Sequence, residues 1–165
     1  MPGDPRHLVR TRALDASEQI HMRHPLNPNS ELFRLGLSDR VGMKRAHLSL
    51  VRIPPGKESF LPHSHAVQEE FLFILDGTGI AEIGGKRVAV GPGDYMGFPT
   101  DGTTHHLINN GAADLIYLMG GERTDVEVAH FPTLGKIGVQ ADRRMTFYDA
   151  DGGQRLPLEA WIVKD

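Results

Sequence analysis

Two histidines and two glutamates stand close together in the stretch LPHSHAVQEEFLFILDG, residues 61–77. Side chains alternate between the two faces of a strand, so His63 and His65 point the same way and can converge on one metal ion. Glu69 and Glu70 begin the next apolar run and point to opposite faces, so only one of them can join the histidines. Alternation does not choose between them, and the same residues also fit a solvated loop beside a strand.

A second histidine pair, His105 and His106, starts another apolar run after the turn-rich stretch GDYMGFPTDGTT. A small β-barrel can bring this run beside the first histidines, where one of the two imidazoles would add a third nitrogen ligand. Two such elements together favour a metal site over an exposed loop. The other histidines lack this spacing, and we expect them to be structural or surface residues: His7, His21, His24, His47 and His130.

The composition limits what such a site can contain. The 165 residues include no cysteine, so every protein ligand must be nitrogen or oxygen. The net charge of −3, without a basic stripe, gives no indication of nucleic-acid binding. No apolar run approaches membrane-spanning length, and the polar, proline-containing N-terminus differs from a secretory signal. We therefore expect a cytoplasmic protein with no nucleic-acid or membrane partner.

Short apolar runs separated by glycine and proline turns fill the chain from residue 32 onward, which is typical of an all-β sandwich or barrel. No run carries a 3.6-residue period over three turns, which argues against long helices. The run Phe71–Leu75 lacks polar alternation, so both faces should be covered, one of them by a second sheet, the tail or a partner subunit. The expected strands cover residues 46–53, 71–75, 80–83, 86–90, 95–98, 105–109 and 115–119.

The two ends of the chain differ from this pattern. Residues 1–30 are polar and broken by prolines, and we expect an arm that packs on the barrel or on a partner subunit. Within it, Asp15 and Glu18 have the spacing of a capping box around one helical turn. Residues 31–165 should form the barrel with a C-terminal extension, and residues 145–163 predict a last hairpin or tail around the turn DADGG.

The first histidine stretch resembles one of the two motifs of the cupin superfamily. In that motif a glycine precedes His-x-His, and a glutamate and a second glycine follow at fixed intervals. Here six residues separate Gly56 from His63, four separate His65 from Glu70, and six separate Glu70 from Gly77. The interval before His63 is one residue longer than in the motif, an insertion in a turn.

The second stretch resembles the other cupin motif. Five residues separate Gly93 from Pro99, two separate Gly102 from His105, and three separate His105 from Asn109. Two residues instead of one lie between Pro99 and Gly102, again an insertion in a turn. The 15 residues between the two motifs match the short spacing of small, bacterial, single-domain cupins.

The resemblance implies a double-stranded β-helix, the jelly-roll barrel of cupins, with a metal site inside. It selects Glu70 over Glu69, which would need a seven-residue interval to the following glycine, and His105 over His106. Glu69 is then a surface or supporting carboxylate, His106 a packed histidine, and Asn109 a residue of barrel geometry. The implied metal ligands are His63, His65, Glu70 and His105.

Three imidazoles and one carboxylate suit one divalent transition metal ion (Fe, Mn, Ni, Zn or Cu) and leave coordination positions open. We expect a mostly apolar pocket around it, with Leu72, Ile74 and Leu107. The resemblance implies a metal-dependent enzyme of the dioxygenase, isomerase or lyase type, acting on a small molecule in the barrel. The alternative is a non-catalytic module that binds or senses a small molecule or metal. We expect a homodimer, and the sequence assigns no catalytic residue.

Overall fold

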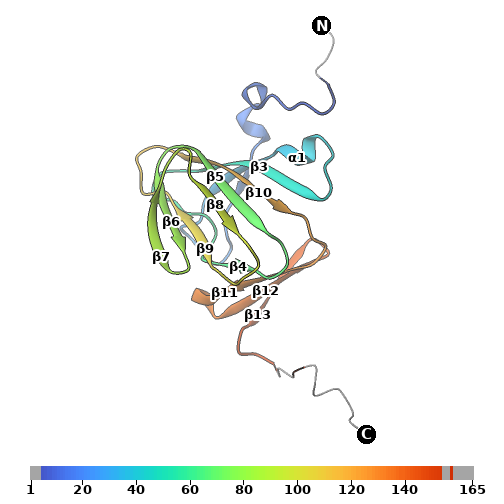
Figure 1. The fold of residues 1–165 in the computed structure, drawn as a ribbon, viewed down its shortest axis with the longest axis vertical. Helices are drawn as coiled ribbons and strands as arrows, with labels where there is room; N and C mark the ends of the chain where they lie inside the picture. Colours follow the sequence, from blue (N-terminus) through green and yellow to red (C-terminus); the bar gives the residue numbers. More distant parts are fainter. Residues whose placement is uncertain (1–4, 154–156, 158–165) are drawn as a thin grey trace.

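The computed structural model describes residues 5–153 and residue 157, and antiparallel strands dominate it (Figure 1). Three short 3₁₀ turns (residues 11–13, 16–18 and 132–134) and the single-turn helix α1 (Leu37–Arg40) are its helical elements within this range. The strands are β1 (Ile20–Met22), β2 (Leu32–Gly36), β3 (Ala46–Ile53), β4 (Ser64–His65), β5 (Glu70–Asp76), β6 (Gly79–Ile83), β7 (Lys86–Val90), β8 (Tyr95–Phe98), β9 (His105–Ile108), β10 (Leu115–Glu122), β11 (Glu127–Phe131), β12 (Lys136–Ala141) and β13 (Arg144–Asp149).

The strands form two walls of a barrel. One wall is a six-stranded sheet in the order β1-β2-β3-β10-β5-β8. The other combines a three-stranded sheet, β7-β6-β9, with a four-stranded sheet, β13-β12-β11-β4. Backbone hydrogen bonds of residues 57–63 to β9 join these two sheets. In Figure 1, β6, β7 and β9 lie on one side of the barrel, and β11–β13 lie at the end opposite α1.

The barrel is closed around an apolar core that both walls share. The six-stranded sheet contributes Val51 on β3, Ile74 on β5 and Tyr117 on β10, while β6 and β9 contribute Ala81 and Leu107. Each of these five residues is at most 2% exposed. Leu107 and Tyr117 also line a cavity that extends from this core toward β4 and the β11–β13 sheet.

Asn109 closes the turn after β9 with three hydrogen bonds, as its place in the second motif predicts. Its side-chain nitrogen donates to the carbonyls of Ile53 (2.7 Å) and Ala113 (2.9 Å), and its side-chain oxygen accepts from the Gly111 backbone (3.0 Å). Asn109 is fully buried. Its role is therefore to satisfy backbone groups that would otherwise be buried without partners.

The all-β prediction is confirmed, and each expected strand overlaps an observed one: β3, β5, β6, β7, β8, β9 and β10. The capping box is also confirmed, because Asp15 accepts from Ser17 and Glu18 accepts from the Asp15 backbone. Within residues 1–30, β1 pairs with β2 and so extends the six-stranded sheet. None of the helices across residues 5–153 has the length and hydropathy that crossing a membrane requires.

The structure also contains a hairpin that the sequence analysis did not predict. It pairs β12 with β13 through the two-residue turn Asp142-Arg143, and not through the DADGG turn that follows β13. Both turn residues have positive φ, 50° and 61°. This is the backbone of the tight primed turns that match the twist of a hairpin, and it normally favours Asn or Gly, so the sequence Asp-Arg hides it. The part of the predicted hairpin at residues 154–156 and 158–163 lies outside the described residues.

Candidate metal centre

The fold brings His63, His65, Glu70 and His105 together, and we refer to them as the four-residue cluster. One ligand atom from each lies within 4.8 Å of the ligand atoms of the others. The backbones of His63 and His105 exchange two hydrogen bonds, 3.3 and 2.8 Å long, which place their side chains next to each other. His65 follows on β4, and Glu70 begins β5.

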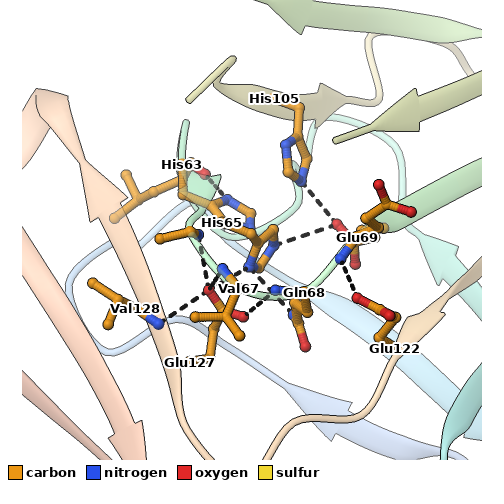
Figure 2. Close-up of polar contacts among 12 residues, drawn as sticks. His63, His65, Val67, Gln68, Glu69, His105, Glu122, Glu127 and Val128 are labelled. Carbon is orange, nitrogen blue, oxygen red and sulfur yellow. Dashed lines mark hydrogen bonds and ion pairs between the residues drawn. The ribbon is translucent and has the colours of Figure 1, made fainter. Parts of the chain in front are cut away.

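The side chains of His63, His65 and His105 lie close together (Figure 2). Nε2 of His105 lies 2.8 Å from Oε2 of Glu70, and Nε2 of His65 lies 3.7 Å from the same oxygen. The ring centroids of His63 and His105 are 4.5 Å apart. The side chains of His65, Glu70 and His105 are only 9%, 10% and 4% exposed, so these polar groups are largely removed from water.

The hydrogen bonds around the cluster leave ring nitrogens available for a ligand. Nδ1 of His63 donates to the Leu61 carbonyl oxygen (2.7 Å), which leaves the Nε2 lone pair directed into the cluster. Nδ1 of His65 lies 3.8 Å from Oε1 of Glu127 and 3.2 Å from the Gln68 amide. Nε2 of His65 is buried and has no hydrogen-bond partner among the described residues. A divalent ion that prefers nitrogen and oxygen ligands fits this ring nitrogen and the ligand atoms of the other three cluster residues.

Electrostatics hold the cluster in the protonation state that a metal requires. Burial, reinforced by repulsion from His105, lowers the pKa of His63 to about 3, so its ring is neutral at pH 7. Burial alone would raise the pKa of Glu70, but the hydrogen bond from His105 and the nearby His65 and His63 rings outweigh it and lower that pKa. A neutral imidazole and an ionised carboxylate are the metal-binding forms of these side chains.

Aromatic rings hold two of the imidazoles from outside the cluster. The Phe98 ring stacks on His105 with centroids 3.9 Å apart and planes at 11°, and the Phe131 ring stacks on His63 at 5.7 Å and 18°. Phe98 and Phe131 are each 4% exposed. Because both rings are packed, they limit the rotamers of the imidazoles and keep the cluster preformed.

The cluster opens into a cavity of about 730 Å³. Leu72, Leu107 and Met119 form an apolar part of its wall, as expected for Leu72 and Leu107, whereas Ile74 lies in the core below. The volume suits a sugar-sized molecule. Tyr117 also lines this cavity. Polar groups that the sequence did not connect with the site line it as well: His24, Arg34, His47 and Arg123.

The chain is similar to proteins of known fold. The family model described as "Cupin domain" (Cupin_2) matches residues 49–121, a range that contains the whole cluster. Solved structures of the cupin superfamily match the same fold. This chain contains a cupin domain. A search of curated proteins found no match.

Two solved structures resemble this cupin over nearly their full length. A "Putative sugar phosphate isomerase" from Acidithiobacillus ferrooxidans is 28% identical with a TM-score of 0.85, over 92% of this chain and 97% of the other. A "sugar phosphate isomerase" from Silicibacter pomeroyi is 26% identical with a TM-score of 0.74, over 87% and 96%. A predicted oxalate decarboxylase from Thermotoga maritima is 24% identical with a TM-score of 0.57, over 67% and 97%, and supports the fold alone.

Glu127 supports the cluster of this cupin, and the sequence analysis did not identify it. Its carboxylate is 3% exposed and accepts four backbone N–H groups at the end of β4 and on β11. Figure 2 shows these bonds meeting at Glu127, directly beside His65. A signal was present in the sequence, since Glu127 shares a strand face with Ala129 and Phe131, where a carboxylate is unexpected. The donors are Ala66 (3.0 Å), Val67 (3.2 Å), Gln68 (2.7 Å) and Val128 (3.0 Å).

Glu69 and His106, which are adjacent in sequence to Glu70 and His105, have other contacts. The Glu69 backbone N–H donates to Oε2 of Glu122 (3.1 Å), and Glu69 is exposed and not part of the cavity wall. His106 is buried, and its Nε2 lies 3.4 Å from Oε2 of Glu58. Neither side chain belongs to the cluster among the described residues.

Proposed function

We propose that this cupin is a metal-dependent isomerase that acts on a phosphorylated sugar inside the barrel. The observation that carries the proposal is the buried four-residue cluster on the wall of a sugar-sized cavity. The two structures described as sugar phosphate isomerases support the choice of reaction, because their similarity extends over almost the whole chain. Similarity of fold alone would not support it.

The cluster would hold one divalent transition metal ion, Fe, Mn, Ni, Zn or Cu. His63, His65 and His105 would supply nitrogen, and Glu70 would supply one oxygen. A bound ion of this kind supplies a Lewis acid that polarises a carbonyl or hydroxyl oxygen of the substrate.

The residues of the chain would position the substrate and protect it from water. An aldose–ketose isomerisation moves a proton between neighbouring carbons without net oxidation, so it needs a dry, ordered cavity more than an external co-reactant. Leu72 and Met119 provide apolar wall. Burial raises the pKa of Tyr117, so its hydroxyl stays protonated at neutral pH and can donate a hydrogen bond.

The test begins with metal-stripped protein that is reloaded with one ion at a time. Each form is incubated with a panel of aldose and ketose phosphates, and the products are followed by NMR. We expect interconversion with at least one ion and its loss in His105→Ala. Carbon dioxide release or oxygen uptake would indicate a lyase or a dioxygenase instead. Binding without any turnover would contradict the isomerase and favour the non-catalytic binding or sensing module.

We also propose a homodimer that uses the outer face of the six-stranded sheet. Phe71 and Phe73 on β5 are only half-buried there, and Tyr95 on β8 is 65% exposed although it pairs with Phe73. Light scattering should give twice the mass of one chain. Tyr95→Glu should yield monomers, whereas Tyr148→Glu, at an exposed residue of β13, should not. A monomeric wild-type protein would refute the dimer.

A further inference from the structure

Two arginines on the cavity wall share one carboxylate. Arg34 on β2 and Arg123 directly after β10 both line the cavity, whereas Asp39 on α1, which pairs with both, does not. Nε of Arg34 also donates to the Ser49 hydroxyl (2.9 Å), and Nε of Arg123 donates to the Ala46 carbonyl oxygen (3.4 Å). Asp39 therefore orients the two guanidinium groups from behind and leaves their other edges toward the cavity.

The sheet register places His47 on the same face of the sheet as Glu70 of the metal cluster. His47, Gly121 and Glu70 are direct partners on β3, β10 and β5, so they share one face of the sheet. Two strand spacings separate the backbones of His47 and Glu70, about 10 Å. A Cβ at Gly121 would lie 3.2 Å from Nε2 of His47 and 2.3 Å from the Glu69 carbonyl oxygen. The glycine thus leaves room for the imidazole to lie over β10.

This end of the cavity contains polar groups without partners. Nδ1 of His47 and Oγ1 of Thr124 are buried and have no hydrogen bond within the described part of the chain. Asp39 pairs with both Arg34 and Arg123, and Lys44, Glu122 and Asp125 also line this cavity. Buried polar groups normally have a partner, so vacant groups beside two guanidinium groups indicate a site for an anion.

We propose that Arg34, His47 and Arg123 bind the phosphate group of the substrate, with the sugar extending from them to the four-residue cluster. This inference rests on the proposed function. A guanidinium binds two oxygens of one anion in a plane. Phosphate offers three terminal oxygens in a tetrahedral arrangement, so it can satisfy donors from three strands at once. A planar carboxylate presents only two oxygens, which fits this arrangement less well.

The first test is binding of inorganic phosphate, measured by calorimetry on metal-stripped protein so that the ion cannot bind the probe. We expect Arg34→Gln and Arg123→Gln each to weaken binding about 30-fold or more, and His47→Gln to weaken it less. Arg52→Gln is the matched control, since Arg52 pairs with Asp114 on the outer face of the same sheet, and it should bind phosphate as the wild type does. Equal affinity in the wild type and both arginine variants would overturn the proposal.

A second measurement needs no variant and so does not depend on folding of the substituted chains. Wild-type protein is treated with an arginine-selective dicarbonyl reagent with and without inorganic phosphate, and the modified peptides are quantified by mass spectrometry. The side chains of Arg34, Arg52 and Arg123 are similarly exposed, at 25%, 32% and 33%. Phosphate should protect Arg34 and Arg123 but not Arg52. Equal modification with and without phosphate would overturn the site.

The two proposals fail in different ways. If the metal-loaded protein interconverts sugar phosphates while the arginine variants keep the wild-type KM for them, the phosphate site is wrong and the isomerase stands. If phosphate binding is lost in the variants but no sugar phosphate is converted, the site stands and the isomerase is wrong. Tighter binding of a sugar acid than of the corresponding sugar phosphate would assign the site to a carboxylate and refute our choice of anion.

Discussion

Replacing Glu127 by glutamine tests how the cupin positions His65. Oε1 of Glu127 accepts three backbone N–H groups, whereas Oε2 accepts one, from Gln68 at 2.7 Å. The glutamine oxygen can replace Oε1, but its NH₂ group then faces the Gln68 N–H. One hydrogen bond to a charged acceptor is lost and a donor is left unsatisfied, which should lower the free energy of unfolding by about 2 kcal/mol. For a chain of this length the melting temperature should fall by about 4–8 °C.

The same substitution should weaken metal binding. Glu127 holds the loop after His65, and loss of such a supporting group typically costs about 10- to 100-fold in metal affinity. Chemical denaturation of the metal-free protein measures the free energy of unfolding, and a competition titration with a chromogenic chelator measures the metal affinity. Glu122→Gln is the control, because Glu122 accepts a backbone N–H at an exposed position and should change both values little. Wild-type stability together with wild-type metal affinity in Glu127→Gln would refute this role.

Three further predictions follow from the same geometry. Because the pKa of His63 falls from 6.5 to about 3 on folding, the unfolded chain alone binds a proton between these values, so the metal-free protein should lose stability below about pH 6.5. The loss is up to about 1.4 kcal/mol per pH unit. In urea titrations from pH 7 to 5, the unfolding free energy of His63→Gln should change less steeply with pH than that of the wild type. An unchanged slope would contradict the assignment. Asn109→Ala should cost about 3 kcal/mol of unfolding free energy and leave metal stoichiometry unchanged, and a stability equal to the wild type would contradict its role in the turn. His105→Ala should lose bound metal by mass spectrometry, whereas Glu69→Gln should retain it, and the reverse result would exchange their roles.

Much of the fold could be predicted because its signals are local. Gly77 shows why: it has a φ of 78°, and a Cβ there would lie 2.2 Å from the Asp114 carbonyl oxygen. Such a turn requires glycine, so the sequence marks the end of β5 directly. The turn at Asp142-Arg143 adopts an equally special backbone without glycine, and the sequence does not predict the hairpin there for that reason.

The cluster and its surroundings depend on different kinds of information. The intervals within the two motifs were enough to prefer Glu70 over Glu69, and the fold turns Glu70 toward the cavity. In contrast, Glu127 reaches Ala66 and Gln68 across about 60 residues of chain. His47 faces the cavity because β10 lies between β3 and β5, a register that no local pattern encodes. Long-range pairing therefore decides which polar residues support the site.

The most direct test of the account is an anomalous difference map from a crystal of metal-loaded protein, collected at the absorption edge of the ion. We predict one peak per chain, at about 2.0–2.3 Å from a ring nitrogen of His63, His65 and His105 and from a carboxylate oxygen of Glu70. A fully loaded crystal with its peak elsewhere, or with no peak between these four side chains, would contradict the central claim.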